Sequence, residues 1–225
     1  MQNQTPLIDL PEEMPDFQTA MSELGRIPLI LYQGLEQAAS EAAGFRDANC
    51  PSERMDEGLT ASLVRFRLQR YLKRVGVESQ LEDELSIDPL PFMGISLHYG
   101  TYHVKVLKGA SGCLPGCGDS EKKVRFYNQV QTMYLVDNRP MQTNANLIVL
   151  WDLDLSYALS GVWLALPAAG GARAGEVSAF WLERIPHPSE GLAGIAPQAP
   201  PPQDDLDGLV VPLEVDRRAV RSNER

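Results

Sequence analysis

Four residues with metal-binding side chains lie between positions 98 and 117. His98 and His103 belong to a segment of alternating polar and apolar residues, and Cys113 and Cys117 enclose a Leu-Pro-Gly turn. Structural zinc is held by four nitrogen and sulfur ligands, which commonly come as two close pairs. The four residues therefore form a candidate zinc site that would fasten a loop to a β-hairpin. The alternative is a polar hairpin face beside two unlinked thiols.

Carboxylates form a second candidate site. Asp152 and Asp154 follow the apolar run 147–151 at the spacing that puts two side chains on one face of a strand, and Glu176 and Glu183 belong to a later segment. Carboxylate pairs hold Mg²⁺ in phosphoryl-transfer enzymes. Asp152, Asp154 and Glu176 are thus candidate catalytic residues of a metal-dependent nuclease with magnesium as its cofactor. The alternative is that the aspartates end a strand and begin a turn.

A further acidic and basic pair follows the glycine-rich loop 109–118. Glu121 and Lys123 make a Glu-x-Lys pair that Asp119 precedes. The pair resembles the shortest part of the metal-binding strand of restriction-type nucleases, which implies a strand at this position. A solvated helix start is the alternative, because acidic residues are favoured in a first helical turn.

Arginines lie at helical spacing in the segment 57–75. Arg67, Arg70 and Arg74 fall beside the apolar stripe of this predicted helix. Arginine binds carboxylates and phosphates through paired hydrogen bonds, so we name the three as candidate partner-binding residues for a protein or, as an alternative, for nucleic acid. A third interpretation is pairing within the chain, since residues 1–57 hold 11 Asp and Glu against three Lys and Arg.

Composition limits the class of protein. The chain has 225 residues, of which 44% are hydrophobic and 22% charged, which excludes collagens, coiled coils and wholly disordered chains. Its net charge of −10 gives little general attraction to nucleic acid. The three cysteines are too few for a disulfide framework. Apolar runs are far shorter than a membrane span, and the first residues do not read as a secretory signal, so we expect a cytoplasmic location and no membrane contact.

The elements that must position these residues divide into helices and strands. We expect a helix from Asp16 that restarts at Pro28 and stops at Gly44, and a second helix from Glu57 to Val75 that Asp56 caps and Gly76 ends. The predicted parts are a disordered lead at 1–15, a helical part with an acidic connector at 16–91, an antiparallel β-rich part at 92–185 and a disordered Pro-rich acidic tail at 186–225. Segregated helices and hairpins favour the α+β class, with the helical part packed on a mostly antiparallel sheet.

The first hairpin of the β-rich part has a predicted register. With Tyr99 and Gly100 as the two-residue turn, Leu97 faces Tyr102 and Ser96 faces His103. Alternation then places the apolar residues of both strands on one face and the two histidines on the other. Strands are also expected at 147–151, where the apolar run indicates burial on both faces, at 161–166 and at 177–182.

No complete catalytic set accompanies these elements. The chain has no Gly-x-Ser-x-Gly, no phosphate-binding Gly-x-x-x-x-Gly-Lys-Ser/Thr and no Gly-x-Gly-x-x-Gly segment. We therefore expect a non-catalytic accessory or regulatory protein that acts through protein–protein contacts. The alternative is the metal-dependent nuclease, or another phosphoryl-transfer enzyme that acts on nucleic acid.

Overall fold

The structure is a computed structural model that describes most of the chain between residues 14 and 190. The described residues are 14–49, 55–78, 85–90, 94–109, 113–130, 133–136, 139–142, 145–173 and 176–190. The predicted disordered lead lies outside them except for residues 14 and 15. The predicted tail lies outside them from residue 191 onward.

Three helices precede the sheet: α1 (Phe17–Leu24), α2 (Ile27–Asn49) and α3 (Glu57–Glu78). The predicted cap is confirmed, because the Asp56 carboxylate accepts from the Leu59 N–H at 2.9 Å. Asp16, the predicted start of the first helix, caps α1, since its carboxylate accepts from the Thr19 N–H at 2.7 Å. The predicted stops at Gly44 and Gly76 are wrong. An interior glycine costs a helix only about 1 kcal/mol, so a glycine by itself does not end one.

Six strands form the main sheet, in the order β1-β2-β3-β6-β7-β8. All neighbours are antiparallel except β3 and β6, which confirms a mostly antiparallel α+β fold. A parallel pair needs a long crossover, and residues 109–144 supply it. The strands are β1 (Leu85–Leu90), β2 (Gly94–Tyr99), β3 (Tyr102–Lys108), β6 (Ala145–Leu153), β7 (Leu159–Ala169) and β8 (Ser178–Arg184).

Two features of the sheet differ from the sequence prediction. The sheet begins at β1, inside the segment that was expected to be a connector, where Pro89 is compatible with a strand because β1 is an edge. The crossover also contains a two-stranded ribbon of β4 (Met133–Val136) and β5 (Arg139–Gln142), together with the short helix α4 (Glu121–Tyr127). The strands predicted at 147–151, 161–166 and 177–182 correspond to β6, β7 and β8.

The β2–β3 hairpin has the predicted faces but a different pairing. His98 lies opposite His103, and Leu97 lies opposite Val104, so the two-residue loop is Gly100-Thr101 and not Tyr99-Gly100. Gly100 has a φ of 54°, a conformation that tyrosine would adopt only with strain. Moving the turn by one residue shifts the pairing by two, so every side chain keeps its face.

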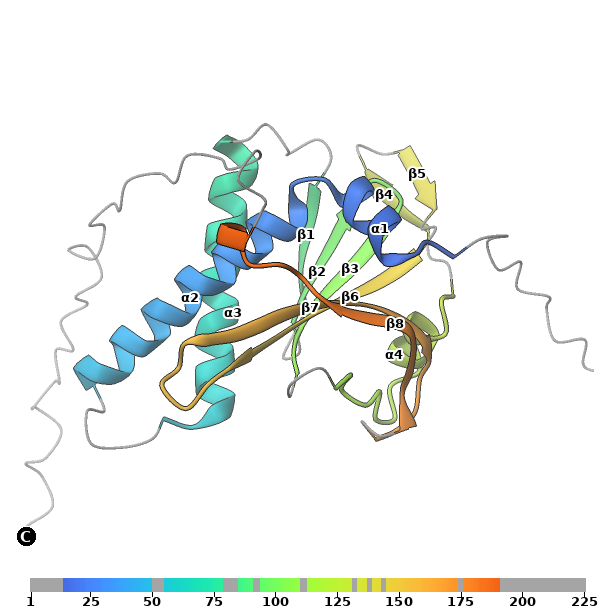
Figure 1. The fold of residues 1–225 in the computed structure, drawn as a ribbon. Helices are drawn as coiled ribbons and strands as arrows, with labels where there is room; N and C mark the ends of the chain where they lie inside the picture. Colours follow the sequence, from blue (N-terminus) through green and yellow to red (C-terminus); the bar gives the residue numbers. More distant parts are fainter. Residues whose placement is uncertain are drawn as a thin grey trace, which may run out of the picture.

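The helices cover one face of the sheet, and the crossover covers part of the other (Figure 1). The large core joins α1, α2 and α3 to residues of β1, β2, β3, β6 and β7, including Leu97, Val104 and Leu147. On the opposite face, Phe126 and Tyr127 of α4 pack with Cys117, Ile148 and Leu150. Residues 145–151 of β6 are consequently buried on both sides, as predicted for the apolar run.

A buried amide pair fixes the end of α4 to the sheet. The Gln129 side chain donates to the carbonyls of Asn146 and Pro167 at 2.9 and 2.8 Å and accepts from the Asn146 N–H at 2.8 Å. The Asn146 side chain donates to the carbonyl of Phe126 at 3.0 Å. These bonds tie the crossover to the start of β6, the strand that runs parallel to β3. No turn motif in the sequence specifies this path of the chain.

Two glycines of α2 should respond to alanine in opposite directions. A Cβ at Gly34 would lie 2.6 Å from Cδ1 of Tyr71 and 2.8 Å from Cδ1 of Leu68, so α2 and α3 cross closely at this point. A Cβ at Gly44 meets nothing within 4 Å. We expect Gly34→Ala to lower the free energy of unfolding by about 1–3 kcal/mol, and Gly44→Ala to raise it by about 0.5–1 kcal/mol. Urea unfolding of both variants measures this, and equal effects would contradict the close crossing.

Candidate functional site

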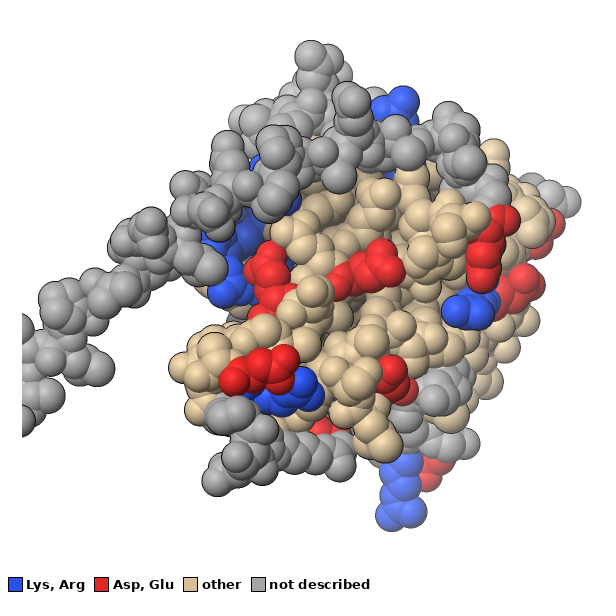
Figure 2. Space-filling view, turned by 60° about the vertical axis from the view of Figure 1, so that its left-hand side comes forward, with Lys and Arg blue, Asp and Glu red and all other residues tan. Residues whose placement is uncertain are grey.

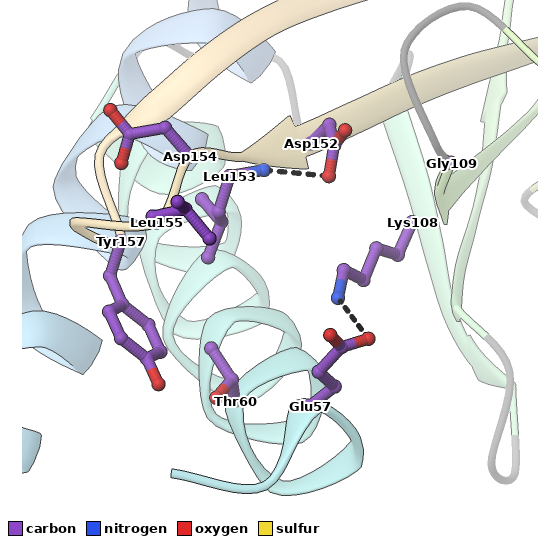
Figure 3. Close-up of a pocket in the computed structure, with 9 residues that line it drawn as sticks. All are labelled: Glu57, Thr60, Lys108, Gly109, Asp152, Leu153, Asp154, Leu155 and Tyr157. Atoms are coloured by element: carbon purple, nitrogen blue, oxygen red, sulfur yellow. Dashed lines mark hydrogen bonds and ion pairs between the residues drawn. The ribbon is translucent and has the colours of Figure 1, made fainter. Parts of the chain in front are cut away.

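A pocket of about 410 Å³ lies where the first turn of α3 meets the ends of β3 and β6. Its charged lining residues are Glu57, Lys108, Asp152 and Asp154. Figure 3 shows Lys108 and Glu57 pointing toward each other, with Nζ and Oε2 3.7 Å apart. Such a pair on the protein surface contributes little to stability and leaves the pocket with mixed charge.

Asp154 is used by its own turn. Its Oδ1 accepts hydrogen bonds from the backbone N–H groups of Ser156 and Ala158 and from the Ser156 hydroxyl, at 2.8, 3.0 and 2.6 Å. These bonds lower the pKa of Asp154, the Ser156 hydroxyl having the largest effect. In Figure 3 the Asp154 carboxylate points away from Lys108 and Glu57. The residue thus acts as a turn-forming aspartate, which was the alternative to metal binding.

The structure does not bring the three nuclease candidates together. Asp152 and Asp154 lie at the start of the β6–β7 turn, whereas Glu176 follows the other end of β7, a strand whose length is about 35 Å. The Glu176 carboxylate accepts from the Arg173 N–H at 3.1 Å, and Glu183 is exposed on β8. Within the described ranges no group of three or more His, Cys, Asp or Glu residues is arranged to hold a metal ion.

The two histidines of the zinc hypothesis face each other across β2 and β3. Their rings are stacked with centroids 4.2 Å apart, and Nε2 of His103 lies 2.6 Å from the Ser96 hydroxyl. His103 also contacts the ring of Phe126 edge to face. Burial, reinforced by His98 and Lys105, lowers the pKa of His103 to about 3. His103 is therefore a neutral ring, and both histidines are packed into the sheet face on the side of α4.

The two cysteines do not complete a zinc site with these rings. Cys113 is exposed, whereas Cys117 is 1% exposed in the core beneath α4. Burial raises the pKa of the Cys117 thiol, which disfavours the thiolate that zinc requires. Stacked imidazoles also present their faces to each other, although metal ligands must direct ring nitrogens at one point.

The Glu-x-Lys pair lies on a helix and not on a strand. Glu121 and Lys123 belong to the first turn of α4, where the Ser120 hydroxyl accepts from the Lys123 N–H. The expected likeness to a nuclease strand is therefore wrong. Acids in a first helical turn are favoured by the helix dipole, which accounts for Glu121 at this position.

The three predicted partner-binding arginines have different environments. Nε of Arg67 lies 3.2 Å from the Glu41 carboxylate of α2, so this residue links two helices. The Arg74 guanidinium lies over the Tyr71 ring at 5.6 Å, with Nε buried and without a hydrogen-bond partner in the part of the chain that the structure describes. Arg70 is exposed, and its guanidinium lies 5.9 Å from the Phe66 ring.

Arg70 belongs to an outer stripe of α3 that faces solvent. The outer stripe consists of five exposed residues, namely Leu59, Ser62, Phe66, Arg70 and Lys73. Leu59 is 48% exposed and Phe66 is 54% exposed, both high values for apolar side chains. The inner stripe of the same helix, formed by Val64, Leu68, Leu72 and Val75, is buried in the large core.

Leu59 and Phe66 are not among the site residues predicted from the sequence. At about 100° per residue, both fall on the side of the helix opposite the inner stripe, together with Arg70 and Lys73. That periodicity was available in the sequence. Two of the three predicted arginines lie on the flanks, where Arg67 pairs with α2 and Arg74 stacks on Tyr71.

The remaining surface gives few indications of function. Figure 2 shows basic side chains next to acidic ones on the visible face, so the coloured residues there form no continuous basic patch. None of the helices in the described ranges is long and apolar enough to cross a bilayer. Comparisons with protein-family models, with curated proteins and with solved structures give no match to this chain.

The buried imidazole predicts acid sensitivity. Between pH 6.5 and about 3 an unfolded chain protonates this side chain, whereas His103 in the fold stays neutral. The unfolded state then binds more protons than the folded state. The free energy of unfolding therefore decreases as the pH is lowered through this window, by at most about 1.4 kcal/mol per pH unit. We expect a shallower fall for His103→Gln, measured by urea unfolding at several pH values. Parallel curves for the two proteins would contradict a neutral buried ring.

Proposed function

We propose that this protein is a non-catalytic regulatory or accessory protein whose outer stripe of α3 binds a protein segment carrying aliphatic and acidic side chains. The observation that supports this most is the exposed Phe66 ring, which has the guanidinium groups of Arg67 and Arg70 at 6.0 and 5.9 Å. An aromatic ring beside arginine is the composition typical of residues that dominate protein interfaces.

The order of side chains along the outer stripe defines the expected partner. Leu59 and Phe66 occupy its first half, and Arg70 and Lys73 its second half. Phe66 is 54% exposed, so covering the rest of its side chain would contribute about 1–1.5 kcal/mol. The two cations have no ion-pair partner among the described residues, and they would select carboxylates and accelerate association more than they add affinity.

One of the three predicted arginines, Arg70, belongs to this surface, and Phe66 forms its apolar centre. Arg67 is engaged by Glu41, so its contribution to binding would be indirect. Arg74 is excluded because its guanidinium is packed on Tyr71. The protein-binding class expected from the sequence is thus kept, with Phe66 and Arg70 as its principal residues. The expected cytoplasmic location stays a prediction.

The test is a titration of the full chain with a labelled peptide of about twelve residues that combines Leu and Val with Asp and Glu. We expect saturable binding that Phe66→Ala or Arg70→Glu weakens at least about tenfold, and that added salt also weakens. Phe180→Ala and Lys122→Glu are the matched controls, because these residues are exposed on β8 and α4.

Two outcomes would overturn this proposal. One is binding that is unchanged in Phe66→Ala and Arg70→Glu but lost in a control variant. The other is the absence of saturable binding both in the natural chain and in a full-length variant whose five acidic residues between positions 204 and 216 are changed to their amides. A peptide with Asn and Gln in place of its acids should bind several-fold more weakly.

A further inference from the structure

We infer that the chain supplies a competing occupant of this site: residues 204–216 bind the outer stripe of α3 within the same molecule and reduce its access to a partner. This inference rests on the proposed function and adds its regulation.

The composition of residues 204–216 is complementary to the outer stripe, because the segment is acidic and aliphatic. Residues 204–216 read DDLDGLVVPLEVD and contain five acidic residues, six aliphatic residues and no Lys or Arg. Asp204, Asp205 and Asp207 form an acidic block, and Leu209, Val210 and Val211 follow as an aliphatic block. The outer stripe has the same two chemical halves, a cationic one and an apolar one.

The order of these blocks fixes the direction of binding. With the acidic block at Arg70 and Lys73, the aliphatic block lies over Phe66 and Leu59 when the segment runs antiparallel to α3. From Lys73 to Leu59 the helix rises about 21 Å, which an extended segment of about seven residues spans. Pro212 has no N–H for a helix interior, so an extended segment is the expected form.

The described chain ends where this segment has access to α3. Residues 188–190 form the short helix η2, and His187 beside it contacts α2, with Nε2 3.1 Å from the Glu36 carboxylate and its ring edge against Tyr32. α2 in turn packs along α3. Residues 191–203 reach at most about 45 Å when extended, more than enough to cross two adjacent helices.

Tethering makes weak contacts effective. A segment joined by a short connection has an effective concentration on the order of millimolar at its site, so it occupies the outer stripe without high intrinsic affinity. Occupancy by carboxylates also screens Arg70 and Lys73 from an incoming acidic partner. The segment would then act as a competitive inhibitor that a stronger partner displaces.

The experiment neutralises the segment in the full chain. Asp204, Asp205, Asp207 and Asp216 are changed to Asn, and Glu214 to Gln. The labelled acidic and aliphatic peptide should bind this variant at least about fivefold more tightly than the natural chain. Introducing Phe66→Ala as well should remove the gain, because the gain depends on the outer stripe. Changing Arg217 and Arg218 to Gln is the matched control and should not tighten binding.

The outcomes separate this inference from the proposed function. Equal binding by the natural and neutralised chains, with Phe66→Ala weakening both, would overturn the competing segment and leave the docking site standing. Saturable binding by neither chain would overturn both. A gain that persists in Phe66→Ala would show that the acids act by general repulsion and not at the outer stripe, and would overturn the inference.

Discussion

The fold depends on one strand that must be covered on both faces. Residues 145–151 of β6 are buried throughout, with Leu147, Val149 and Trp151 toward α1, α2 and α3, and Ile148 and Leu150 toward α4. An apolar strand of this kind cannot lie at an edge or under solvent without large loss of hydrophobic stabilisation. Burial of both faces and both edges determines what surrounds β6. Strands β3 and β7 lie beside it, the helices α1, α2 and α3 cover one face, and the crossover covers the other.

This requirement decides which helix surfaces are used. The inner stripe of α3 closes the large core together with α2, and the crossing at Gly34 brings these two helices close enough to share it. Once that side is buried, the opposite side of α3 is left with Leu59, Phe66 and Arg70 in solvent. On the other face of the sheet, the polar residues Ser96, His98 and His103 are drawn under α4 as packing groups. The two histidines that the sequence offered as zinc ligands are therefore used for packing.

Local patterns predicted most of the fold. The helix caps at Asp16 and Asp56 and the alternating faces of the hairpin depend on neighbouring residues, so they could be inferred from the chain alone. The helix ends at Asn49 and Glu78 could not, because an interior glycine lowers helix stability by only about 1 kcal/mol and does not by itself end a helix. The parallel pairing of β3 with β6 depends on contacts of Gln129 and Asn146 across the crossover, which no local pattern reveals. The nuclease candidates show the same limit, because Asp154 and Glu176 lie at the two ends of β7, a separation that no local pattern reveals.

The central claim is that the outer stripe of α3 is a docking surface that the chain itself can occupy. Photo-cross-linking from a benzoylphenylalanine placed at position 66 of the full chain tests it most directly. Mass spectrometry should find cross-links from position 66 to residues 204–216 of the same molecule, at a yield independent of protein concentration and reduced when the five acids are neutralised. Cross-links to other regions alone, or a yield that rises with protein concentration, would contradict the account.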